Sequence, residues 1–216
     1  MSDDLAVLYH DARRRVRHLA EGLGGQVHAP VPACPGWRVR DVVAHLTAIS
    51  EDAVAGRLAG PPDEAVTAGQ VERLRGVEVP ELLDRWEGAA EPFAEIIAAF
   101  AVWPAVIDVV THEHDIRGAL DRPGGRDDAA VAACARVLLA FEPPVPLTVR
   151  LPLGDVVVGG PGDDRLVLRS TPWEVLRWRM GRRSRRQLAA MAWTGDPAPV
   201  LDHLVVFGPA GRDLLE

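Results

Sequence analysis

The chain contains no lysine and no asparagine among its 216 residues, and it has only two cysteines. All 24 basic residues are therefore arginine, a bias that a GC-rich genome explains. Cys34 and Cys134 are too few and too far apart for a disulfide framework or a four-cysteine zinc site. The sequence thus excludes a disulfide-stabilised scaffold, and we expect both thiols to be free.

Long apolar runs are also absent. No stretch approaches the roughly 18 consecutive apolar residues of a membrane-spanning helix. The first residues, MSDDLAVLYHDARRR, lack the apolar core of a secretory signal, so we expect a cytoplasmic protein without a membrane partner. The formal net charge of −7 argues against a nucleic-acid partner, because a basic field supplies most of that affinity. Apolar residues at 48% and charged residues at 25% are typical of a globular protein.

The first two thirds of the chain read as helical. Apolar residues recur at helical spacing, and glycine or proline interrupts the pattern between the periodic stretches. Residues 63–78 are ambiguous, with a short helix expected over 68–75. The longer expected helices cover 3–23, 38–58, 80–101, 104–120 and 127–141.

The helical pattern ends at FEPPVPLTV, residues 141–149, because three prolines cannot continue a helix. LTVRLPL, DVVVGG and RLVLRS then alternate as strands do and are separated by Gly-Asp and Gly-Asp-Asp turns, which predicts a short antiparallel meander. Helical spacing returns over 173–180, 185–193 and 198–208. We therefore expect a two-domain α+β protein, with a helical domain over 1–142 and a small α+β domain over 146–216.

Two histidines and one carboxylate stand out within the helical part. Asp108 and His112 are four residues apart and share one helix face with apolar neighbours. His45 is in register with Val42 and Ile49, so it too is expected to point inward. A buried carboxylate needs a partner, and a divalent metal held by all three side chains is the simplest one. Alternatively, Asp108 accepts a hydrogen bond from His45 or pairs with an arginine.

Three protein ligands would leave a coordination position open, as catalytic metal sites do. Imidazole and carboxylate ligands suit zinc, but also iron, manganese, nickel or cobalt. Asp115, three residues after His112, is a candidate to orient that imidazole, or else to pair with Arg117. Glu113 and His114 rotate away from His112, and a solvated or inter-domain face is expected for both.

Two segments resemble a known family. CPGWRVRDVVAHL at 34–46 and DVVTHEHDIRGAL at 108–120 resemble the two metal motifs of the mycothiol-dependent maleylpyruvate isomerase family. GRRSRRQLAAMAWTGDPAPVLD at 181–202 resembles the end of the small C-terminal domain that many members carry. The family belongs to the wider group of DinB-like metal-binding four-helix bundles, so the resemblance implies that fold for the N-terminal domain.

The resemblance also implies a function. It places one divalent metal, usually zinc, on His45, Asp108 and His112, although the family usually has glutamate at the position of Asp108. It implies mycothiol as a thiol cosubstrate and a small electrophilic or acidic substrate, in an isomerase or a thiol S-transferase. A non-catalytic metal-binding or small-molecule-binding module of the same fold is the alternative, and either would be a monomer or a homodimer.

Further residues are candidates with ordinary structural alternatives. Arg182 and Arg183 lie in a Gly-Arg-Arg-Ser turn and are candidates to bind an acidic substrate, because guanidinium binds carboxylate in a bidentate fork. A solvated helical face is the alternative for such arginines. Trp37 is expected to pack the loop onto the bundle rather than to stack on substrate. Cys34 lies either near the site or in ordinary packing.

Overall fold

The computed structural model describes residues 4–160 and 166–216. The chain divides into two compact units: the first ends at Gly124 and also takes in Glu216, and the second is Gly125–Leu215. We expected the division at the proline-rich segment after residue 142. The contacts instead group the preceding helix with the second unit, because that helix packs on α7 (Pro172–Arg179).

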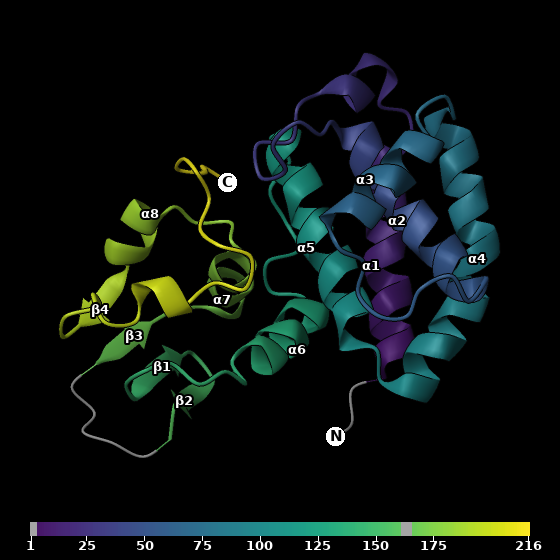
Figure 1. The fold of residues 1–216 in the computed structure, drawn as a ribbon. Helices are drawn as coiled ribbons and strands as arrows, with labels where there is room; N and C mark the ends of the chain where they lie inside the picture. The colour runs from purple at the N-terminus through teal and green to yellow at the C-terminus, as the bar shows by residue number, and fades with distance from the viewer. Residues whose placement is uncertain (1–3, 161–165) are drawn as a thin grey trace. The chain divides into compact units, whose positions relative to one another are not determined.

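The first unit is a four-helix bundle (Figure 1). α2 packs on α4, α1 packs on α5 and α4, and α2 also contacts α5, while the short α3 lies against α2. This confirms the predicted bundle. Its elements are α1 (Leu5–Ala20), η1 (Gly24–His28), α2 (Val39–Val54), α3 (Glu64–Arg73), α4 (Val79–Phe100) and α5 (Trp103–Ala119).

Local signals set where these helices begin and end. Asp4 caps α1 by accepting a hydrogen bond from the Val7 backbone N–H at 3.2 Å. The Asp41 carboxylate accepts from the Arg38 backbone N–H at 2.9 Å and so caps the start of α2. Pro104 occupies the first turn of α5, where its missing N–H has no cost. The predicted bounds were therefore close: α1 and α2 are shorter by a few residues, α4 and α5 are shifted by one residue, and α3 begins four residues before the expected start at 68.

A buried polar network joins three helices inside this apolar core. Trp86 of α4 donates from its indole Nε1 to the Tyr9 hydroxyl of α1 at 2.9 Å, and that hydroxyl lies 3.1 Å from Ser50 Oγ of α2. Burial raises the pKa of Tyr9 above its ordinary value. Because the Tyr9 hydroxyl of α1 has hydrogen-bond partners on both α2 and α4, it favours one orientation of the three helices.

The second unit combines helices with a four-stranded mixed sheet of order β2-β1-β3-β4. β1 pairs antiparallel with β2 and parallel with β3, and β3 pairs antiparallel with β4. The two-domain α+β fold is thus confirmed. The elements are α6 (Ala129–Leu138), β1 (Leu147–Leu151), β2 (Gly154–Val158), β3 (Val167–Arg169), α7 (Pro172–Arg179), α8 (Arg185–Ala189), β4 (Ala192–Thr194) and η2 (Leu201–His203).

The antiparallel meander was wrong, because β3 does not pair with β2 but with the other side of β1. Leu147, Thr148 and Val149 are consecutive and all buried, as in a central strand covered on both faces. β2 is mostly exposed and forms an edge. The expected Gly-Asp-Asp turn at 162–164 lies outside the described residues.

Two predicted helices near the C-terminus were also wrong in extent. The helix expected over 185–193 ends at Ala189, and the next residues pair with β3, with Trp193 opposite Leu168. Of the helix expected over 198–208, only the short η2 is present. The Val206 backbone N–H donates instead to the Arg179 carbonyl at 2.8 Å, so it does not make the hydrogen bond within the segment that a helix requires.

None of the helices in the described parts of the chain combines the length and apolar character that a bilayer crossing requires.

Candidate metal centre

His45 of α2 and Asp108 and His112 of α5 converge inside the bundle. His45 Nε2 lies 3.2 Å from Asp108 Oδ2, and His112 Nε2 lies 3.4 Å from Asp108 Oδ1. One donor atom from each side chain can be chosen so that all three lie within 4.8 Å of one another. The two imidazole rings meet edge to face at a centroid distance of 5.3 Å. The structure therefore brings together all three residues that the sequence singled out as a metal set.

The helices position these side chains through simple periodicity. Asp108 and His112 are one turn apart on α5, so their side chains lie one above the other. His45 is 4% exposed because the face of α2 that carries it packs into the bundle. The side chain of Asp108 retains 26% exposure, so one side of the cluster can be reached from solvent.

The donor set suits a divalent cation. The Nδ1 atom of His112 is engaged by the Asp115 carboxylate at 3.0 Å, which leaves its Nε2 atom directed at Asp108. Two imidazole nitrogens thus face one carboxylate, an arrangement rich in lone pairs that a cation would satisfy. Without an ion, His45 Nε2–H can donate to Asp108 Oδ2 across the same 3.2 Å. The residues present fit a metal, and they also fit that hydrogen-bonded alternative.

The loop before α2 contributes two more side chains to this region. The Trp37 ring lies 5.4 Å from the His45 ring and 6.1 Å from the His112 ring, the latter nearly parallel at 22°. Cys34 Sγ lies 3.4 Å from Asp115 Oδ2 and 3.9 Å from His112 Nδ1. Trp37 therefore packs over the bundle as expected, and specifically against the two histidines.

Cys34, His112 and Asp115 form a second group whose ligand-type atoms lie within 4.8 Å of one another. Sequence reasoning considered Cys34 and Asp115 separately and did not join them. The signal was present, because Cys34 begins the motif that contains His45 and Asp115 lies in the motif that begins at Asp108. What sequence alone lacked was the contact between the loop and α5.

The burial of Glu113 differs from what the sequence led us to expect. The residue was expected on a solvated or inter-domain face, yet it is 0% exposed, because α1 covers this side of α5. Arg15 Nε donates to both of its oxygens at 3.0 and 2.9 Å, and Arg117 Nε donates to Oε1 at 3.0 Å. Burial raises the pKa of Glu113 above its ordinary value, while the two guanidinium groups act in the opposite direction. His114 is buried as well, at 4% exposure.

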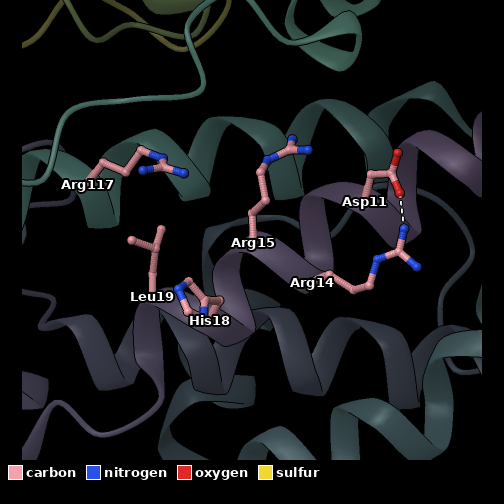
Figure 2. A pocket seen from close by; sticks show the side chains of 6 residues that line it. All are labelled: Asp11, Arg14, Arg15, His18, Leu19 and Arg117. Carbon is pink, nitrogen blue, oxygen red and sulfur yellow. Dashed lines mark hydrogen bonds and ion pairs between the residues drawn. The ribbon is translucent and has the colours of Figure 1, made fainter.

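A basic pocket of about 380 Å³ lies between α1 and α5 (Figure 2). Its arginines have partners within the bundle: Arg14 pairs with Asp11, and Arg15 and Arg117 both bind Glu113. None of its lining residues belongs to either carboxylate–histidine group. The lining residues are Asp11, Arg14, Arg15, His18, Leu19 and Arg117.

The two candidate substrate-binding arginines differ in their surroundings. Arg183 is 6% exposed, donates to both oxygens of Glu174 at 3.0 and 2.7 Å, and lies over the Trp173 ring at 5.2 Å. Arg182 is half-buried and donates from Nη1 to the Met180 carbonyl at 2.6 Å. Arg183 thus has a clear packing role within the second unit, whereas Arg182 is the more accessible of the pair.

These features define a four-helix bundle with a buried two-histidine, one-carboxylate cluster, followed by a small α+β unit. The family model described as the mycothiol maleylpyruvate isomerase N-terminal domain matches residues 9–122, more than half of the chain. The chain therefore belongs to this family, as its two motifs indicated.

Two solved structures are similar to the chain. One is a histidine-to-alanine mutant of the mycothiol-dependent maleylpyruvate isomerase, with a TM-score of 0.57 and 11% identity over 83% of this chain and 89% of that chain. The other is the mycothiol-dependent maleylpyruvate isomerase, with a TM-score of 0.51 and 13% identity over the same shares. At these identities the likeness establishes the fold alone. No curated protein matches the chain.

Proposed function

We propose that this protein is a metal-dependent enzyme that uses a low-molecular-weight thiol, mycothiol, for isomerisation or S-transfer on a small electrophilic substrate. The observation that carries the proposal is the convergence of His45, Asp108 and His112 on one point inside the bundle. Membership of the mycothiol maleylpyruvate isomerase family supports the choice of thiol.

In this proposal His45, Asp108 and His112 hold a divalent ion, with zinc as the first choice of element. When bound, such an ion lowers the pKa of a coordinating thiol toward neutrality and so supplies a nucleophilic thiolate. The partly exposed side of Asp108 is where an exogenous thiol would approach, because His45 and His112 are both buried.

The chain's own side chains have separate roles. Asp115 holds His112 through Nδ1, and Trp37 covers both imidazole rings and limits the access of water to them. We assign Arg182 and Arg183 as candidates for the carboxylate of an acidic substrate, with Arg182 preferred because Glu174 occupies Arg183.

The test compares metal content and thiol-conjugating turnover in the parent protein and in His45→Ala, purified without chelators. We expect the variant to lose the metal and the turnover together. His203→Ala, which removes an exposed histidine from the second unit, is the matched control and should retain both. Unchanged metal content in His45→Ala would remove the proposed site.

A non-catalytic binding module is the second candidate. It is favoured by Asp108, because aspartate reaches one methylene less far than the glutamate that the family resemblance leads us to expect. This alternative predicts that the parent binds metal through His45 and yet shows no turnover with mycothiol and any small electrophile tested.

A further inference from the structure

The segment Cys34-Pro35-Gly36-Trp37 forms a tight turn. The Trp37 backbone N–H donates to the Cys34 carbonyl at 3.0 Å, and Gly36 has φ of +85°. Proline at the second position and a positive-φ glycine at the third are the requirements of a type II turn. The turn brings the first and fourth residues close together, so Cys34 and Trp37 approach the same region of the bundle.

Backbone hydrogen bonds attach this turn to the start of α2. The Val31 N–H donates to the Trp37 carbonyl at 2.9 Å, and the Cys34 N–H donates to the Val31 carbonyl at 3.0 Å. The Val39 N–H, at the first residue of α2, donates to the Ala29 carbonyl at 3.0 Å. Because α2 also carries His45, the turn and that imidazole are parts of one rigid element.

Both side chains of the turn reach His112 on the opposite helix. The Trp37 ring lies nearly parallel to the His112 ring and restricts its rotation. The Cys34 thiol donates to Asp115 Oδ2 at 3.4 Å, and the same oxygen lies 3.0 Å from His112 Nδ1. A carboxylate only accepts hydrogen bonds, so the proton between Asp115 and His112 belongs to Nδ1.

We propose that Cys34, acting through Asp115, and Trp37, which stacks directly on the ring, are positioning residues that set the tautomer and the plane of the His112 ring. The Nδ1–H form leaves the Nε2 lone pair directed at Asp108, as a metal ligand requires. The inference deepens the proposed function, on which its relevance to metal binding rests. The tautomer itself is a property of the chain alone and can be measured without metal.

The first measurement is the nitrogen NMR spectrum of the metal-free protein, which distinguishes the two neutral imidazole tautomers. We expect Nδ1–H at His112 in the parent. Oδ2 of Asp115 faces both Nδ1 and the Cys34 thiol, so in Asp115→Asn an amide nitrogen at that position donates to Nδ1, the tautomer should switch to Nε2–H, and Cys34 loses its acceptor. Cys34→Ser retains a donor and should leave the parent form in place.

The second measurement is affinity for Zn²⁺ and Co²⁺ by competition with a chromophoric chelator. Asp115→Asn should bind about 10–100-fold more weakly, the usual effect of losing an outer partner of a ligating histidine. Cys34→Ala should weaken binding by a smaller factor, and Cys34→Ser should restore it. The Co²⁺ absorption spectrum should change in Asp115→Asn, which a loss of general stability would not cause.

Two controls separate positioning from packing. Cys134→Ala removes the other thiol, in α6 of the second unit, and Asp52→Asn removes a buried carboxylate at a different place on α2. Neither should change the tautomer or the affinity. If the parent binds no metal, the proposed function fails while the NMR test still decides this inference. An Nε2–H tautomer in the parent would overturn it, as would a folded Asp115→Asn with unchanged tautomer and affinity.

Discussion

His45 Nε2 and Asp108 Oδ2 lie 3.2 Å apart although 63 positions separate the two residues in the chain. They come from α2 and α5, so packing of the helices creates this contact, whereas the Asp108–His112 pair is created by one helix turn. The cluster therefore combines one local and one long-range relationship. Substitutions that disturb the long-range contact and substitutions that disturb the local pair can therefore be tested separately.

Changing Asp108 tests the carboxylate. Asp108→Asn keeps the shape and removes the charge, and we expect affinity for Zn²⁺ to fall by at least about 10-fold, because a neutral amide is a poorer ligand. Asp108→Glu keeps the charge and adds reach, so affinity should match or exceed that of the parent. Both values come from competition with a chelator. Equal affinity of Asp108→Asn and the parent would argue for the hydrogen-bonded alternative.

Adding metal should stabilise the helical unit. A ligand that binds only the folded state at 100 times its Kd contributes about 2.7 kcal/mol to the free energy of unfolding. We expect thermal unfolding of the parent, followed by circular dichroism, to shift upward with Zn²⁺. His45→Ala should show no shift and serves as the control. A shift of the same size in that variant would place the bound ion elsewhere.

Asp52 gives a pH prediction for the contact between α2 and α3. Burial acts to raise the pKa of Asp52, but hydrogen bonds from Gln70 (2.8 Å), Arg57 (2.7 Å) and Arg73 (2.9 Å) outweigh it, and the pKa is held below its ordinary value. Its contribution to stability is therefore present above the unfolded pKa of about 3.9 and is lost as pH falls through the lower folded value.

Asp52→Asn should accordingly lower the free energy of unfolding by about 2 kcal/mol near neutral pH, and the difference from the parent should shrink below about pH 4. Urea unfolding at several pH values measures this. Glu72→Gln, which removes a carboxylate of an exposed ion pair on the same α3, should stay within about 0.5 kcal/mol of the parent. A pH-independent difference for Asp52→Asn would contradict the assignment.

Substituting Glu113 tests whether its ion pairs with Arg15 and Arg117 hold α1 and α5 together. Glu113→Gln should lower the free energy of unfolding by about 1–3 kcal/mol, because the amide cannot accept the charge-assisted hydrogen bonds of Arg15 and Arg117 equally well. Denaturant unfolding provides the measurement. Glu95→Gln, at an exposed position of α4, is the matched control. If both substitutions have the same small effect, Glu113 does not hold the helices together.

Alanine substitutions of Arg182 and Arg183 should affect different properties of the protein. Arg183→Ala removes both hydrogen bonds to Glu174 and should destabilise the second unit by about 2 kcal/mol. Arg182→Ala should lower stability less than Arg183→Ala does and should raise the KM for an acidic substrate in a thiol-dependent assay. Thermal unfolding and steady-state kinetics together check the pair. An unaltered KM in Arg182→Ala would remove that residue from the proposed substrate site.

Local patterns in the sequence predicted the long helices and the face on which His45, Asp108 and His112 lie. Helical spacing is read from neighbours within one turn, so Asp108 and His112 needed no information about the rest of the chain. The proline-rich segment likewise predicted the change from helices to strands, since proline cannot continue a helix.

The tertiary structure alone decided which elements meet. The parallel pairing of β1 with β3, the strand at Trp193 and the burial of Glu113 beneath Arg15 all depend on partners distant in the chain. So does the contact of Cys34 with Asp115, which joins two motifs that each looked self-contained. Periodicity tells which face of an element is apolar, but which element covers that face depends on the packing free energy of the whole chain, and no local window contains it.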